Sequence, residues 1–377
     1  MTREAKLVFL PDCAGWASKR PGTSCSRRRT IPRGCSPSIH ELGRWFTMYA
    51  PRLEVIEATL DKQRLREACS AAGVATLPSW FPENLASVTE LASQLDFPVL
   101  IKPRLHVFRT RREKGMVVHS PQDLEGAFST FVRRERGREG ERDTTAQPLP
   151  LVQTFVQGAV ENVLSITGFM DRSGTRSIVS ATRKILQRSR PVGVGLAFEG
   201  IAPPEKVAED ALKLCRHLGV FGVFEIEFVW HDNAWRVIDF NPRFYQEMCL
   251  DVARGIPLPL LAYLDACGDL DGLDAALSAA RAHAKPPLCF SDMFTTTLML
   301  ALRAIVNPSA ARDSIVWHWR RRRDLVDATF DLQDPLPLLG HACCELRLGF
   351  EQLPRLFKEA RLPSTAEPAR WQYERTG

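Results

Sequence analysis

Acidic side chains stand inside two short apolar segments of this chain, residues 223–229 and 235–243. Each segment has the composition of a β-strand, and residues 231–233 between them predict a turn. A buried carboxylate without a partner is costly, so such groups are usually paired, hydrated or bound to a metal ion. Carboxylate and amide oxygens are the ligands that a hard cation such as Mg²⁺ prefers. We therefore expect the function to reside in this hairpin.

The geometry of a hairpin limits how these polar side chains can meet. Side chains alternate between faces along a strand, so Glu225 and Glu227 share one face, and Asp239 and Asn241 share one face. All four meet only if the loop has an odd number of residues or if a strand contains a bulge. We expect a three-residue loop at 231–233, with Glu225 opposite Asp239. Glu227 would then lie diagonal to Asp239, about 7–8 Å away between backbones. A two-residue turn without a bulge would scatter the cluster.

Charge and length narrow the class of protein. A chain of 377 residues is long enough for two or three domains, and its 45% hydrophobic and 25% charged residues are typical of a soluble globular protein. The net charge is +6, but residues 1–35 alone hold eight Lys or Arg and two Asp or Glu. The remainder is therefore neutral, which argues against a nucleic-acid-binding body.

The ten cysteines form no CxxC pair, and the chain shows no clear secretory signal. Reduced thiols and a cytoplasmic location are therefore expected. No apolar run is long enough to span a membrane. The best candidate, residues 288–306, contains Asp292 and Arg303 and predicts a buried amphipathic helix.

Residues 14–40 are rich in Arg, Ser, Pro and Gly, with almost no acid, within a basic N-terminal region at 1–50. This composition favours a disordered tail. A transit peptide, a start codon placed too far upstream and a remnant of an N-terminal domain are the alternatives.

Beyond this tail, helices and strands are both predicted. Asp61 is a helix N-cap, and Gly73 ends that helix. The other expected helices cover residues 87–95, 120–134, 206–218, 257–283 and 288–306. The other expected strands cover residues 97–103, 115–119, 151–156, 162–170 and 176–186.

The order of these segments resembles the ATP-grasp superfamily, over about residues 55–265. The segments that carry the resemblance are the Asp61-Lys62 helix, Ile101-Lys102-Pro103, residues 153–158, Arg183-Lys184, residues 225–228 and the Asp239-Phe240-Asn241-Pro242-Arg243 box. The last is the most specific. The similarity is greatest to the carboxylate–amine ligase and carbamoyl-phosphate-synthase-like members.

The resemblance implies an α+β ATP-grasp fold, in which two α+β lobes clamp ATP. Relatives usually carry a longer N-terminal α/β domain, so here that domain is expected to be truncated or missing. The expected organisation is a tail or domain remnant at 1–50, the first lobe at 51–150, the second lobe at 151–270 and a mostly helical C-terminal extension at 271–377.

The resemblance also implies how ATP would be held. Lys102 would contact the α- and β-phosphates, and Lys184 would contact the phosphates from the other side. Adenine would be bound by Gln153, the carbonyl of Thr154 and the N–H of Val156. The ribose would be bound by Glu161 or Gln157.

Glu227, Asp239 and Asn241 would hold Mg²⁺ (or Mn²⁺) between the phosphates. Arg243 is the expected catalytic residue, because its guanidinium suits the transferred phosphoryl group or an acyl phosphate. The alternative for Arg243 is a structural pair with a carboxylate such as Glu225.

The expected activity is a Mg-ATP-dependent ligase that activates a carboxylate as an acyl phosphate for attack by an amine or similar nucleophile. A bicarbonate-activating, carboxylase-like enzyme and a non-catalytic ATP-binding module are the alternatives. The expected partners are small-molecule carboxylate and amine substrates and a second copy in a homodimer, with no nucleic acid and no membrane.

Overall fold

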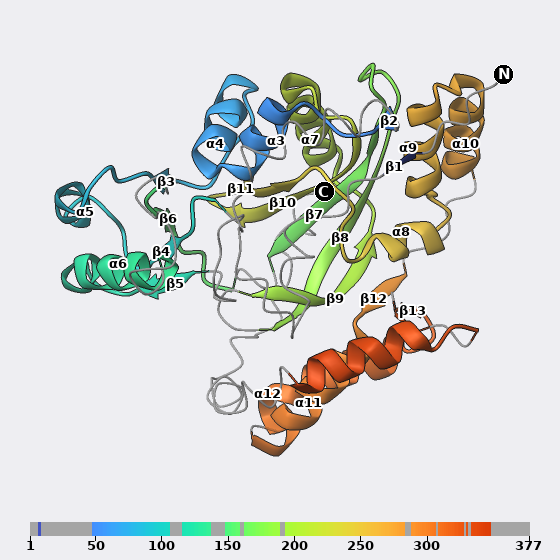
Figure 1. The fold of residues 1–377 in the computed structure, drawn as a ribbon. Coiled ribbons are helices and arrows are strands. Elements are labelled where there is room, and N and C mark those ends of the chain that lie inside the picture. Colours follow the sequence, from blue (N-terminus) through green and yellow to red (C-terminus); the bar gives the residue numbers. More distant parts are fainter. Residues whose placement is uncertain are drawn as a thin grey trace, which may run out of the picture.

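The fold is organised around two β-sheets (Figure 1). It is known from a computed structural model, which describes residues 7–8, 47–105, 115–136, 148–158, 162–188, 193–282, 288–306, 308–327, 329–330 and 333–347. A short parallel pairing also joins β1 (Leu7–Val8) to β2 (Thr47–Met48). The expected disordered tail falls almost entirely outside the described residues, so it stays a prediction.

The smaller sheet has the strand order β3-β6-β4-β5, and its helices are α5 and α6. Its apolar core joins Val99 and Ile101 of the sheet to Leu124 and Phe128 of α6. The elements are β3 (Ser79–Trp80), α5 (Leu85–Ala92), β4 (Val99–Lys102), β5 (Met116–Val118), α6 (Pro121–Arg136) and β6 (Leu151–Thr154).

The larger sheet has the strand order β11-β10-β7-β8-β9-β12-β13. One of its faces is apolar because alternate residues such as Ile166, Phe224 and Ile226 point into a core shared with α7 and α4. The elements of this layer are α3 (Leu53–Leu60), α4 (Lys62–Ala71), β7 (Val163–Met170), β8 (Ser177–Arg188), β9 (Val194–Ile201), α7 (Glu205–Leu218), β10 (Gly222–His231), β11 (Ala234–Asn241), β12 (Cys289–Ser291) and β13 (Leu325–Val326).

The opposite face of the larger sheet changes character along its strands. Phe169, Ile178 and Val223 belong to an apolar core that α9 (Leu258–Cys267) and α10 (Leu270–Ala282) cover. Further along the same strands, residues of the same face are polar. This polar part lies beside α8 (Met248–Ala253) and carries the candidate site.

The hairpin of β10 and β11 corrects the expected loop. The turn is not the predicted three-residue loop but the two residues Asp232 and Asn233, both with positive φ (48° and 56°). A β-bulge between Glu227 and Phe228 supplies the extra residue instead. The register therefore places Glu227 opposite Asp239, whereas a diagonal arrangement was predicted. The second predicted opposition, of Glu225 to Asp239, is also wrong, because Glu225 lies opposite Asn241.

Most predicted helices are confirmed with small shifts of their ends, but the segment predicted as helical over 257–283 is two helices, α9 and α10, because Gly268 ends α9 in the left-handed conformation. Asp61 caps α4 by accepting hydrogen bonds from the N–H groups of Gln63 and Arg64, and Gly219 ends α7 in the left-handed conformation. The prediction of one helix over residues 288–306 is wrong at its start. Residues 289–291 form β12, which pairs with β9, and the helix α11 begins at Met293.

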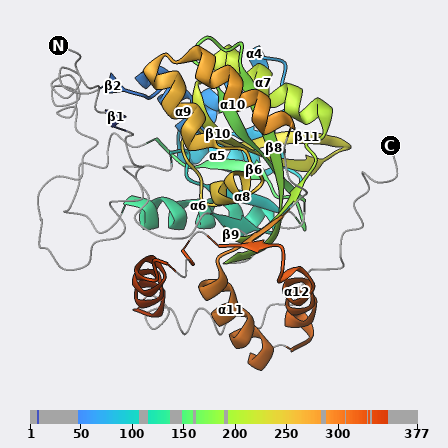
Figure 2. The ribbon, with the colours of Figure 1, turned by 90° about the vertical axis from the view of Figure 1, so that its right-hand side faces the viewer.

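The C-terminal part of the described chain adds helices below the larger sheet (Figure 2). They are α11 (Met293–Val306), α12 (Pro308–Arg321) and a helix at residues 336–347. None of the helices in the described part of the chain is both long and apolar enough to cross a membrane.

The expected lobe boundaries stay predictions, although the strand pairing of β6 concerns the boundary expected at residue 151. β6 was expected to open the second lobe, but its hydrogen bonds are to β3 and β4 of the smaller sheet. In addition, α3 and α4 contribute Val55, Leu65 and Cys69 to the core of the larger sheet.

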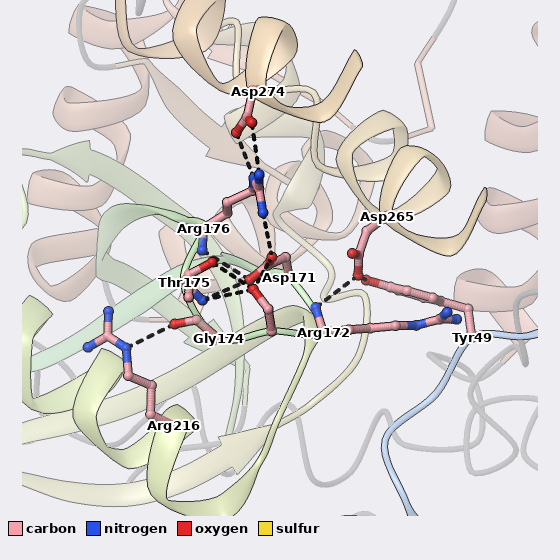
Figure 3. A network of polar contacts seen from close by, with 10 residues as sticks. Tyr49, Asp171, Arg172, Gly174, Thr175, Arg176, Arg216, Asp265 and Asp274 are labelled. Carbon is pink, nitrogen blue, oxygen red and sulfur yellow. Dashed lines mark hydrogen bonds and ion pairs between the residues drawn. The ribbon is translucent and has the colours of Figure 1, made fainter. Parts of the chain in front are cut away.

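A network of polar contacts fixes the turn between β7 and β8 (Figure 3). Asp171 accepts a hydrogen bond from the backbone N–H of Arg176 at 3.0 Å. The guanidinium of Arg176 makes a two-pronged pair with Asp274 of α10, at 2.7 and 2.9 Å. Asp265 of α9 accepts from the backbone N–H of Arg172 at 3.1 Å. The network thus docks the β7–β8 hairpin onto α9 and α10.

Candidate functional site

Lys184 and Glu227 form the centre of the polar face. Lys184 is 5% exposed, and its Nζ lies 3.2 Å from Glu227 Oε1. Burial lowers the pKa of Lys184, but attraction to Glu227, Glu225 and Glu247 outweighs burial, so the net pKa is raised. Lys184 is therefore a fixed cation on β8 beside the carboxylate of Glu227. Its predicted contact with the phosphates stays a prediction.

Asp239 lies directly opposite Glu227 and pairs with the ammonium group of Lys62. Lys62 is the first residue of α4 and is 8% exposed. The sequence placed Lys62 in a motif but gave it no role. The contact was missed because it joins residues 177 positions apart.

Asn241 is oriented by a neighbour on β10. Its Nδ2 donates to Glu225 Oε2 at 3.0 Å, which leaves the amide oxygen Oδ1 on the other side. Arg243 Nη2 lies 3.5 Å from that oxygen, and Arg243 Nη1 donates to the carbonyl of Phe244 at 2.9 Å. Glu225 of β10 thus accepts a hydrogen bond from Asn241 of β11. Burial raises the pKa of Glu225 more than the charge of Arg243 lowers it.

Glu247 is a site residue that the sequence analysis did not select. It is 2% exposed, immediately before α8. Burial and repulsion from Glu225 raise its pKa well above the ordinary value for a carboxyl group. The Glu225 pKa is also raised, first by burial and then by repulsion from Glu227. The signal available was a carboxylate six positions after Asn241, which is weak without the fold.

The smaller sheet holds the expected adenine and phosphate residues on neighbouring strands. Lys102 Nζ donates to Gln153 Oε1 at 3.3 Å, and Gln153 Nε2 donates to Ser79 Oγ at 2.8 Å. Thr154 ends β6, and Val156 lies two residues later in the connection toward β7. The predicted ribose residue Glu161 lies outside the described residues, whereas its alternative Gln157 is exposed in the connection.

A second ion pair ties the two groups of residues together. Arg104, two residues after Lys102, makes a two-pronged contact with Asp61, with both distances 2.8 Å. Burial raises the pKa of Asp61, but Arg104 and the backbone N–H groups of α4 outweigh it, so the pKa is lowered. Because Lys62 follows Asp61, the start of α4 contacts both the end of β4 and Asp239.

The residues expected to hold a divalent cation fit that role in chemistry and placement. Glu227 of β10 and Asp239 of β11 are register partners, and Asn241 lies on the same face of the sheet. Their oxygens are the hard ligands that Mg²⁺ prefers. Within the described ranges, no group of three or more His, Cys, Asp or Glu side chains has a metal-holding arrangement, and the expected set is two carboxylates with one amide.

A family model identifies the domain that contains this site. Residues 85–246 match the model of the ATP-grasp domain. The match covers less than half of the chain, and it confirms the resemblance to the ATP-grasp superfamily that the sequence predicted.

Curated relatives of the chain are distant and longer. Over 226 residues the chain is 24% identical to the carbamoyl phosphate synthase large chain of Methanoculleus marisnigri, covering 57% of this chain and 20% of the relative. Over 201 residues it is 22% identical to the formate-dependent phosphoribosylglycinamide formyltransferase of Sulfurisphaera tokodaii, covering 51% and 47%. The chain thus spans less than half the length of either relative.

A solved structure supports the fold. The chain resembles the biotin carboxylase domain of 2-oxoglutarate carboxylase from Hydrogenobacter thermophilus, with a TM-score of 0.51 and 18% identity, over 63% of this chain and 50% of that one. That protein was crystallised with MgADP, ADP and bicarbonate. The α+β ATP-grasp fold expected from the sequence is confirmed.

Proposed function

We propose that the chain is a Mg-ATP-dependent ligase, which converts a carboxylate into an acyl phosphate that an amine or similar nucleophile attacks. The observation that carries the proposal is the ordered face of the larger sheet, where Glu227, Asp239 and Asn241 adjoin the buried cation Lys184. The named relatives and the MgADP-bound neighbour support it.

In this proposal ATP lies between the two sheets. Lys102 and Lys184 bind its phosphates from opposite sides, and Gln153, Thr154 and Val156 bind adenine, with Glu161 or Gln157 at the ribose. Because a triphosphate carries several negative charges, fixed cations lower the cost of holding it. Lys184 would then exchange part of its contact with Glu227 for a phosphate oxygen.

A Mg²⁺ ion bound by Glu227, Asp239 and Asn241 would neutralise phosphate charge and align the transferred phosphoryl group. The residues of the chain prepare this arrangement. Glu225 fixes the amide of Asn241 so that its oxygen faces away from Glu225, and Lys62 pairs with Asp239 on the same face.

Arg243 is proposed to contact the transferred phosphoryl group. Its guanidinium is exposed beside Asn241, where it can bind phosphate oxygens in a fork. We expect Arg243→Ala to lower kcat about 100-fold, with little change in the affinity for ADP. An unchanged kcat would assign Arg243 a structural role.

The proposal is tested by ADP release from ATP in the presence of carboxylates and amines, tried singly and in pairs. Release that requires a carboxylate and is completed by an amine supports the ligase. Release that requires bicarbonate instead supports the carboxylase-like alternative, which the bicarbonate-bound neighbour makes worth testing. Tight nucleotide binding without release under any condition would leave an ATP-binding module. A cytoplasmic location and a homodimer remain part of the proposal.

A further inference from the structure

Four buried side chains near the candidate site carry polar atoms that have no hydrogen-bond partner among the described residues. These atoms are Thr182 Oγ1, Glu247 Oε1, Asp251 Oδ1 and Arg254 Nε. The exposed fractions of the four residues are 0%, 2%, 0% and 8% in the same order. A buried donor or acceptor without a partner is costly, so native proteins match such groups with a ligand or with water.

These residues gather between α8 and the polar face of the larger sheet. Arg254 Nη1 donates to Ser180 Oγ of β8 at 2.7 Å, and Asp251 Oδ2 accepts from Thr167 Oγ1 of β7 at 3.0 Å. The guanidinium of Arg254 also lies close above Gly200, where a Cβ would stand 3.3 Å from Nη1. Gly200 is the register partner of Thr182. Thr182 therefore lies on the same face of the sheet as the guanidinium, two residues along β8 from its partner Ser180.

The cluster lies within reach of the proposed phosphoryl-transfer site. Thr182 is the register partner of Ser165, and Ser165 is the partner of Glu227 on the next strand. Two strand spacings separate Thr182 from Glu227, about 10 Å. A small molecule can span this distance, so a group bound at Arg254 can belong to a substrate that reacts beside Glu227.

The unmatched atoms define the chemistry of their ligand. Arg254 Nε–H is a charged donor and the Thr182 hydroxyl can also donate, so together they suit a carboxylate. Asp251 Oδ1 lies 3.9 Å from Arg254 Nη1, too far for a hydrogen bond, and Glu247 Oε1 belongs to a carboxyl group that hydrogen-bonds to Glu225. Both oxygens can still accept, and with the charge of Asp251 they suit an ammonium group. A ligand that matches all four atoms therefore carries both a negative carboxylate and a positive ammonium group.

We propose that these four residues form a substrate subsite for a zwitterionic amino acid. Arg254 and Thr182 bind its carboxylate, and Asp251 and Glu247 bind its ammonium group. The inference rests on the proposed function, because it names the chemical class of one substrate of the ligase.

Binding of L-α-amino acids tests the subsite separately from catalysis. Each of the twenty is titrated calorimetrically into the full chain in the presence of MgADP. Each amino acid that binds is compared with the matching acid that lacks the amino group and the matching amine that lacks the carboxylate. The subsite predicts that at least one amino acid binds, and that each truncated probe binds at least about ten-fold more weakly.

Thr182→Val is the sharpest variant, because valine nearly preserves the shape and removes only the unmatched hydroxyl. Its Tm without ligand should equal or exceed that of the wild type, while its affinity for the amino acid should fall about ten-fold. Thr59→Val is the control, since Thr59 is equally buried but its hydroxyl already donates to the carbonyl of Ile56 at 2.8 Å. The control should keep the wild-type affinity. If Thr182→Val does not fold, Glu247→Leu, which removes the acceptor oxygens, is titrated with the same probes, and wild-type affinity for the ammonium-bearing probes refutes the subsite.

The outcomes separate the subsite from the proposed function. Amino-acid binding that Thr182→Val weakens, without ADP release, supports the subsite and refutes the ligase. ADP release with other carboxylates and amines, without amino-acid binding, refutes the subsite alone. A lower ligand-free Tm of Thr182→Val with unchanged amino-acid affinity indicates that ordered water fills the cluster, and this also refutes the subsite.

Discussion

Single residues of the candidate site are held by partners from distant elements. Lys184 and Glu227 lie on two strands separated by β7, and Lys62 of α4 reaches Asp239. Because these ion pairs are largely buried, each charge depends on its partner. The arrangement holds these side chains in place before any ligand arrives.

Removal of one charge from the central pair should destabilise the fold. In Glu227→Gln, the Lys184 ammonium, at 6% side-chain exposure, loses its nearest carboxylate. We expect a loss of about 3 kcal/mol in the free energy of unfolding, measured in urea without nucleotide. The double variant Glu227→Gln with Lys184→Met should recover most of this loss. Equal stability of Glu227→Gln and the wild type would show that the pair contributes nothing.

At the scale of elements, the β10–β11 hairpin determines which side chains meet. The two-residue turn matches the right-handed twist of the strands, and both of its residues have positive φ. The bulge then shifts the register by one residue, which brings the acidic side chains of both strands to the same face. Without it, Glu227 would face Ile238, and the carboxylates would lie on opposite faces.

The turn offers a direct test at Asn233, whose φ is 56°. Asn and Gly tolerate this conformation, but a β-branched residue does not. Asn233→Val should therefore lower the free energy of unfolding by about 1–2 kcal/mol. Asn233→Gly should match or exceed the wild type in the same urea titration. If the two variants are equally stable, the turn does not have the conformation described.

Helix α12 should make stability depend on pH through His318. Its Nδ1–H donates to the carbonyl of Ser314 at 2.8 Å, and its Nε2 lies 3.1 Å from the hydroxyl oxygen of Ser291. Burial lowers the pKa of His318 below the ordinary value near 6.5. Above that value both the folded and unfolded states are neutral, and the full stability is present. Below it the unfolded state binds a proton first, so stability falls with pH.

The loss should reach at most about 1.4 kcal/mol per pH unit below 6.5. His318→Gln removes this group, so its Tm should decline less steeply between about pH 6.5 and 5 than that of the wild type. Parallel declines would assign the pH dependence to other groups.

The sequence predicted the elements of the site but not their pairing. Alternation in residues 223–229 and the spacing of Asp239 and Asn241 were sufficient to predict two strands with a shared polar face. The choice between an odd loop and a bulge was not predictable, because both place the polar side chains of the two strands on the same face. Local pattern also missed β12, since a three-residue strand is defined by its partner β9 rather than by its own composition.

At the scale of the whole molecule, the site depends on how the two sheets are joined. The start of α4 contacts the smaller sheet through Arg104 and the larger one through Asp239. Contacts of this kind join residues far apart in sequence, such as Lys62 and Asp239, so no local pattern predicts them. The family resemblance predicted the layout of the fold, whereas Glu247, Asp251 and Arg254 became candidates only once their burial was known.

The most direct test of the central claim is the Mg²⁺ dependence of ADP binding, measured by calorimetry on the wild type and Asp239→Asn. The wild type should bind ADP more tightly with Mg²⁺ than without it, and Asp239→Asn should weaken MgADP binding at least about ten-fold. Asp274→Asn, which removes a carboxylate paired with Arg176 away from the site, should behave like the wild type. Mg²⁺-independent ADP binding, or unchanged MgADP affinity in Asp239→Asn, would contradict the assignment of this face of the sheet as the metal–nucleotide site.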